Sequence, residues 1–146
     1  MTLTLLSDVA VALVLNAVII NIWEEMVWTG FVQRRAMTRW GELHGSAFTA
    51  LLFAGIHLPL AFDDAHGAGD VLLGLAILIG TGVGLRLIIS RLDLWSGRSL
   101  LTVGVLHAGF NTSADLVEPE YDWVRIAVTV VLGLAVVALN HHRSRP

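Results

Sequence analysis

The residues of this sequence best suited to do chemistry are two adjacent glutamates inside an apolar segment. Glu24 and Glu25 lie within Leu3–Val32, which is long enough to cross a membrane. An ionisable side chain at the centre of a membrane-spanning helix costs on the order of 2.5–3.5 kcal/mol. Such a group is retained where the protein interior uses it, so the pair indicates a functional site. Adjacent helical positions point about 100° apart, and we therefore expect different roles for the two carboxylates.

Two later apolar segments carry the other polar groups at membrane depth. His57 lies in one, and His107 and Asn111 lie four residues apart on one helix face of the other. Counted from the nearest flanking charged residues, Glu24 and His107 lie roughly 15 Å deep and His57 roughly 22 Å deep. A hydrocarbon core is about 30 Å thick, so we expect these groups to meet in one layer.

The same residues form a possible metal site. Glu24, His57 and His107 are a His₂Glu set, which suits a catalytic zinc ion with an open fourth position. The helical His-Glu-x-x-His signature of many zinc enzymes is absent from the sequence. A single histidine in a membrane helix is more often an interhelical hydrogen-bond donor, worth about 0.6 kcal/mol. It is the convergence of several polar groups that favours a functional site.

Five apolar segments must position these side chains. The composition, 55% hydrophobic and 14% charged, differs from the roughly 25% charged residues of soluble domains. We therefore predict an all-α polytopic bundle of about five transmembrane helices, forming one integral membrane domain over residues 1–146. Pro59 is expected to kink or end the second helix. The predicted segments are Leu3–Val32, His44–Phe62, Val71–Ile89, Ser99–Leu116 and Trp123–Asn140.

Composition also excludes several functions. Cysteine is absent, which rules out disulfides, thiolate metal sites and a cysteine nucleophile. The net charge of −3 provides no basic surface for nucleic acid. All nine basic residues are arginine, and with the abundant Ala, Gly, Val and Leu this favours a GC-rich bacterial genome.

Loop charge predicts the orientation. The first loop carries Arg34 and Arg35, and the third carries Arg91 and Arg98 with Arg86 close by, whereas the second and fourth loops are acidic. By the positive-inside rule the N-terminus lies outside and the C-terminus in the cytoplasm. We expect a multi-pass protein of the inner (plasma) membrane, with the lipid bilayer as its partner.

Three motifs, in order, resemble those of the CPBP (CAAX protease and bacteriocin-processing, or Abi) intramembrane endopeptidases. Residues Trp23–Phe31 resemble the first, a glutamate pair followed by Arg-Gly. Residues Phe53–Pro59 resemble the second, an aromatic residue three positions before a histidine that continues as Leu-Pro. Residues His107–Thr112 resemble the third, His-x-x-x-Asn. The resemblance defines a catalytic core at about residues 23–115.

The first motif departs from the family at one position. Thr29 stands where the family has an arginine that supports the glutamate pair. Arg34 or Arg35, one turn further on, is the substitute that the sequence suggests.

The resemblance implies hydrolysis of a peptide bond in or near the membrane, with no cofactor required. It implies that Glu24 is the general base for a water molecule that His57 also holds. His107 and Asn111 would hydrogen-bond the developing oxyanion. Further supporting roles fall to Glu25, which orients a neighbour, and to Phe53 and Trp28.

The sequence also allows other functions. One is a zinc-dependent protease that uses Glu24, His57 and His107. Another is a weakly active or inactive membrane scaffold or bacteriocin-immunity protein, which Thr29 favours. The expected partner is a peptide or protein substrate at the membrane, and a homo-oligomer would help to shield the polar site of so small a bundle.

Overall fold

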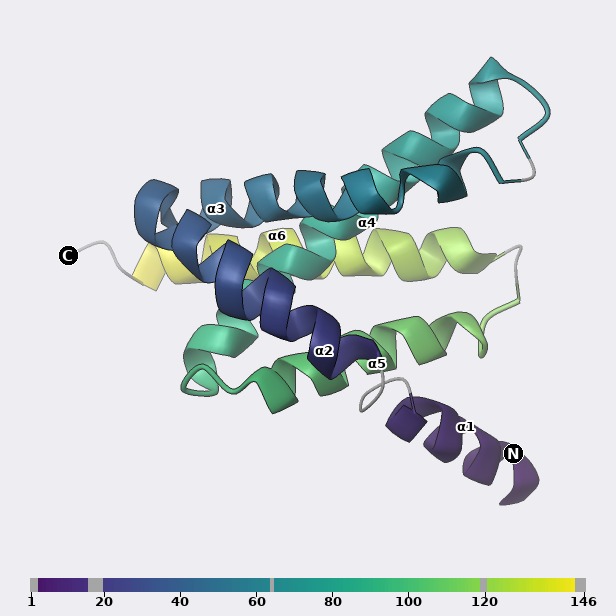
Figure 1. The fold of residues 1–146 in the computed structure, drawn as a ribbon, viewed down its shortest axis with the longest axis horizontal. Helices are drawn as coiled ribbons and strands as arrows, with labels where there is room; N and C mark the ends of the chain where they lie inside the picture. The colour runs from purple at the N-terminus through teal and green to yellow at the C-terminus, as the bar shows by residue number, and fades with distance from the viewer. Residues whose placement is uncertain (1–2, 16–19, 64, 119–120, 144–146) are drawn as a thin grey trace.

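The computed structural model describes residues 3–15, 20–63, 65–118 and 121–143, and this part of the chain contains helices and no strands. The predicted all-α class is therefore confirmed. Figure 1 shows the helices packed as a bundle, with α1 at its edge. In chain order the elements are α1 (Leu3–Leu15), α2 (Ile22–Glu25), the π-helix η2 (Met26–Gln33), α3 (Arg34–Ile56), the 3₁₀-helix η3 (Leu58–Ala61), α4 (Ala68–Trp95), α5 (Leu100–Ala114) and α6 (Asp122–Arg143).

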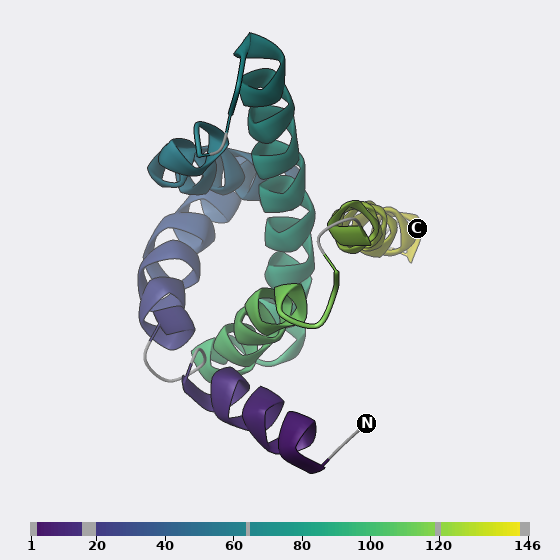
Figure 2. The same cartoon turned by 90° about the vertical axis from the view of Figure 1, so that its right-hand side faces the viewer.

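The first predicted segment is longer than one membrane span needs, so a tilt, a bend or a projection beyond the bilayer is expected. The structure divides Leu3–Val32 into α1 and the continuous pair α2–η2, and residues 16–19 lie outside the described part. Figure 2 shows α1 at an angle to the helix that begins with α2. Hydropathy does not mark this division, because apolar side chains continue on both sides of it.

The chain reverses direction at Gly41, between η2 and the long part of α3 (Figure 1). Gly41 has a φ of 77° and a ψ of 171°, a backbone conformation that favours glycine. Shortly after it, a Cβ on Gly45 would lie 2.5 Å from the backbone nitrogen of Met37. The reversal is thus tight enough to require a residue without a side chain at position 45.

The end of α3 places His57. The helix stops at Ile56, and His57 has a φ of −93° and a ψ of 4°, outside the helical region. Pro59 lies in the first turn of η3, and the proline ring hinders continuation of the preceding helix. The prediction that Pro59 ends this helix is confirmed.

The central helix is α4, which packs against α3, α5 and α6. It is longer than the predicted Val71–Ile89, and its inner turns form an apolar core with α5 through Leu85, Ile89 and Val103. Within the described residues, α4 and the segment Asp122–Leu139 of α6 are long and apolar enough to cross a membrane. Their mean hydropathies are 2.2 and 2.0.

Candidate active site

A stripe of buried polar residues runs along α2 and η2. Asn21, Glu25, Thr29 and Gln33 are spaced four apart, and none is more than 1% exposed. In a regular α-helix this spacing drifts about 40° per step. The wider turns of the π-helix reduce that drift, so the stripe stays directed at α4 and α5. π-Helical segments are rare, and those inside α-helices frequently lie at functional sites.

Glu25 is the centre of this stripe. Its Oε1 lies 2.7 Å from Nδ1 of His107 on α5. Its Oε2 lies 2.9 Å from Nη1 of Arg86 on α4, and the hydroxyl of Thr29 donates to the same oxygen. Both carboxylate oxygens are therefore engaged, and Glu25 joins three helical segments at one point.

The arginine beside Glu25 is Arg86 of α4, and the substitutes for the motif arginine suggested from the sequence, Arg34 and Arg35, were wrong. Arg86 is close to the third loop in sequence, but its side chain is completely buried in α4. Arg34, one suggested substitute for the motif arginine, pairs instead with Asp93, and Arg35 stacks on Phe31. The missed signal is a lone arginine inside an apolar run, which at that depth requires a buried partner.

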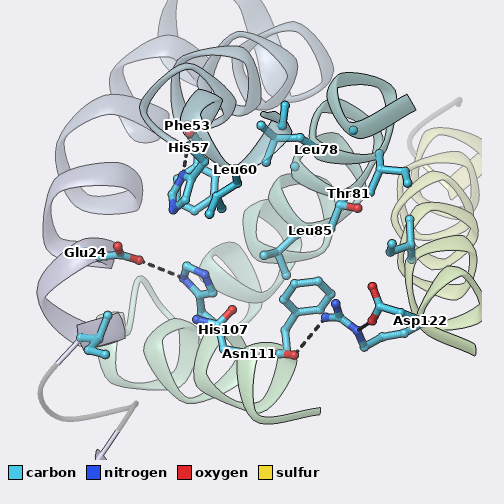
Figure 3. Close-up of a pocket in the computed structure, with 18 residues that line it drawn as sticks. Glu24, Phe53, His57, Leu60, Leu78, Thr81, Leu85, His107, Asn111 and Asp122 are labelled. Carbon is cyan, nitrogen blue, oxygen red and sulfur yellow. Dashed lines mark hydrogen bonds and ion pairs between the residues drawn. The ribbon is translucent and has the colours of Figure 1, made fainter. Parts of the chain in front are cut away.

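The four residues singled out for chemistry line one cavity of about 490 Å³. Glu24 reaches it from α2, His57 from the end of α3, and His107 and Asn111 from α5 (Figure 3). Glu24 Oε2 lies 4.0 Å from His107 Nδ1. Most of the remaining wall is apolar, from α3, η3, α4, α5 and α6, with Thr81, Asp122 and Arg125 as its polar exceptions.

The ring of His57 is fixed by the backbone and by one aromatic side chain. Its Nδ1 lies 2.8 Å from the carbonyl oxygen of Phe53. A carbonyl only accepts hydrogen bonds, so Nδ1 carries the proton and Nε2 of the neutral ring is an acceptor. The Phe53 ring lies 4.3 Å from the His57 ring and 5.8 Å from that of His107. Trp28 packs edge-on against Phe53, with the ring centroids 5.4 Å apart.

Asn111 is oriented by a residue that the sequence analysis did not include in the site. Its Nδ2 donates a 2.9 Å hydrogen bond to Oδ1 of Asn21. A side-chain amide carries two N–H groups, so one stays available to a group in the cavity. The polar stripe thus supports the α5 residues through two contacts, Glu25–His107 and Asn21–Asn111.

The zinc alternative has little geometric support. Among the described residues, no group of three or more histidine, aspartate or glutamate side chains is arranged to hold a metal ion. In the set Glu24, His57 and His107, both histidines engage Nδ1, with the carbonyl of Phe53 and the carboxylate of Glu25, so only Nε2 of each ring is available to a ligand. That the reaction requires no cofactor stays a prediction, which metal analysis of the purified protein would test.

Comparison with known proteins identifies the family. The sequence profile described as Type II CAAX prenyl endopeptidase Rce1-like matches residues 6–113, more than half of the chain. No curated protein and no solved structure matches the chain. The profile includes all three motifs, and it confirms the resemblance on which the sequence analysis relied. The chain is thus a helical membrane protein that belongs to the Rce1-like family of CAAX endopeptidases.

Proposed function

We propose that this protein is an intramembrane endopeptidase whose active site is the cavity between α2, α3 and α5. The observation that carries the proposal is that Glu24, His57, His107 and Asn111 line this one cavity. They come from segments far apart in the sequence.

Glu24 is the general base of this mechanism. Its side chain is 27% exposed, whereas Glu25 is fully buried with both oxygens engaged. A water molecule between Glu24 and Nε2 of His57 would donate one hydrogen to each acceptor. As its oxygen attacks the peptide carbonyl carbon, Glu24 takes its proton. The same proton then passes to the leaving amine as the C–N bond breaks.

His107 and Asn111 stabilise the oxyanion that forms during this attack. Asn111 offers the N–H that Asn21 does not use. His107 becomes a donor at Nε2 when its ring is protonated, and the carboxylate of Glu25 at its Nδ1 balances that charge. A donor of this kind is worth roughly 2.7–4 kcal/mol in the transition state.

The substrate is a peptide segment at the membrane, and the mostly apolar wall of the cavity suits apolar side chains. The basic segments at Arg34 and Arg98 meet at Asp93, at one end of the bundle. Placing this end in the cytoplasm gives the orientation with the N-terminus outside. Arg86 beside Glu25 supports an active enzyme over an inactive scaffold, since Thr29 alone favoured the latter.

The test is peptide cleavage by purified protein in proteoliposomes. The probes are a quenched peptide with a farnesylated CAAX end and the same peptide without the farnesyl group. Glu24→Ala, His57→Ala and His107→Ala should each lower kcat by at least about 100-fold. The matched control is His44→Ala, because His44 is exposed and lies outside the cavity. Wild-type activity in all three variants would refute the proposal.

Metal dependence is tested on the same purified protein, by measuring its zinc content and its activity in chelator. We expect no stoichiometric zinc and full activity in chelator. Bound zinc together with inhibition by chelator would replace the glutamate mechanism with the zinc alternative.

A further inference from the structure

Arg86 is a fully buried cation that stands behind the candidate active site without lining its cavity. It comes from the middle of α4, whereas the site residues come from α2, α3 and α5. Any effect on the reaction must therefore pass through other side chains, and the structure shows two such routes.

The first route leads through Glu25 to His107. Nη1 of Arg86 lies 2.9 Å from Oε2 of Glu25, and the other carboxylate oxygen lies 2.7 Å from Nδ1 of His107. The guanidinium thus holds the carboxylate from one side while the imidazole contacts it from the other. Without the cation, the carboxylate loses the contact that sets its rotation and hence the position of the His107 ring.

The second route leads through Phe53 to His57. The guanidinium carbon of Arg86 lies 4.5 Å from the centre of the Phe53 ring, a cation–π contact. The same ring packs at 4.3 Å against His57. One side chain therefore contacts the supports of both histidines.

Stability alone gives little reason to keep this arginine. Replacing a buried ion pair with apolar residues is often neutral or stabilising. Within the described residues, Nε and Nη2 of Arg86 have no hydrogen-bond partner, so burial of this side chain is not fully compensated. A cation retained under these conditions is better explained by the residues that it positions.

Position 29 offers a second place from which a cation could reach the same carboxylate. Thr29 is one turn after Glu25, and its hydroxyl contacts Oε2. Nη1 of Arg86 lies only 3.4 Å from this hydroxyl, so the two side chains share one small volume. An arginine at position 29 would extend into the space that the guanidinium of Arg86 occupies.

We propose that Arg86 is a positioning residue for the reaction, which holds His107 through Glu25 and His57 through Phe53. The proposal rests on the proposed peptidase function. What matters is a cation at Oε2 of Glu25, and this cation can be supplied from α4 or from position 29.

The experiment moves the cation between the two helices. Arg86→Met keeps the length of the side chain and removes the charge, and the double variant Thr29→Arg/Arg86→Met returns the charge from η2. Removal of a residue that orients a metal-binding histidine typically costs about 10–100-fold in activity, and Arg86 has a similar orienting role toward His107. We expect that loss in kcat for Arg86→Met on the farnesylated peptide, with little change in KM. The double variant should recover at least about a tenth of wild-type kcat, and Arg86→Lys should lie between.

Two control variants distinguish a positioning role of Arg86 from a general effect on the packing of α4. Leu87→Met changes a fully buried neighbour on α4 and should leave kcat unchanged. Thr29→Arg alone places two cations at one carboxylate and should be less active than the double variant. Wild-type kcat in Arg86→Met, or a double variant no better than the single one, would overturn the proposal.

A second readout does not depend on cleavage. The side-chain nitrogen NMR shifts of His107 report its contact with Glu25. They should change in Arg86→Met and return toward wild type in the double variant. If the wild type cleaves neither peptide, the proposed function fails, while these shifts still test Arg86. Unchanged shifts in Arg86→Met would refute the positioning role.

Discussion

Helix α4 contacts α2 and α6 through residues only two positions apart, and the two contacts differ in kind. On one side, the side chain of Arg86 reaches Glu25 of α2 and forms a buried ion pair. On the other side, Gly84 meets α6, where a Cβ on Gly133 would lie 2.5 Å from the carbonyl oxygen of Gly84. The contact with α2 depends on a long charged side chain. The contact with α6 depends on glycines, which have no side chain.

The difference shows what each contact is for. Between helices in lipid, close packing of small residues is a common source of association. The Gly84–Gly133 contact is of this kind, and nothing in it bears on chemistry. Buried charge in a membrane is costly and is kept where it serves a site. We therefore expect changes at the glycine contact to affect stability first, and changes at the polar contact to affect activity first.

The largest effect on stability is expected at Gly84. A Cβ there would lie 2.7 Å from the Cα of Val130, so backbone must move to admit it. Gly84→Ala should lower the free energy of unfolding by about 1–3 kcal/mol. Unfolding in mixed detergent micelles measures this change.

The matched control is one turn away on the same helix. A Cβ on Gly80 meets no atom within 4 Å. Gly80→Ala should be neutral or stabilising, by up to about 1 kcal/mol from helix propensity. Equal destabilisation by the two substitutions would contradict the close-packing account.

A smaller effect is expected at the end of α4, where charges pair outside the site. Asp93 is 1% exposed and accepts from Arg34 and Arg98, both of which are partly exposed. Water can solvate the released guanidinium groups, so Asp93→Asn should cost only about 1 kcal/mol. The value of kcat should stay at the wild-type level. A large fall in kcat would show that this ion cluster also belongs to the catalytic machinery.

The smallest energetic effect is expected at the hydrogen bond between Asn21 and Asn111. A double-mutant cycle with Asn21→Leu and Asn111→Leu should give a coupling energy of about 0.6 kcal/mol, the average for such bonds in membrane proteins. Even so, Asn21→Leu should lower kcat, because it frees the amide that faces the cavity. Unaltered kcat in this variant would remove Asn21 from the support of the site.

Local features of the sequence predict much of the fold. The all-α class follows from hydropathy, and the limits of α5 and α6 lie within two or three residues of the predicted ones. Pro59 marks the end of α3 because a proline acts on its own neighbours. The length of the first segment indicates a tilt, a bend or a projection, but hydropathy does not locate the division between α1 and α2, since both helices are apolar.

The residues of the candidate site likewise include some that local sequence predicts and others that only the fold brings together. Glu24, His57, His107 and Asn111 could be selected from residue type and motif, and the structure brings them to one cavity. Arg86 belongs to none of the three motifs; its position inside an apolar run indicates a buried partner, but only the fold shows that this partner is Glu25, 61 positions away. The stripe from Asn21 to Gln33 was visible as a spacing of four, but an ideal helix would have spread it over several faces.

The central claim is that Glu24 activates a water molecule for peptide hydrolysis. Its most direct test compares single-turnover cleavage of the farnesylated peptide by wild-type and Glu24→Gln protein in proteoliposomes. This substitution keeps the shape of the side chain and removes its basicity. The wild type should cleave the peptide and Glu24→Gln should be slower by at least about 100-fold, with equal thermal stability. Cleavage by Glu24→Gln at the wild-type rate would contradict the account.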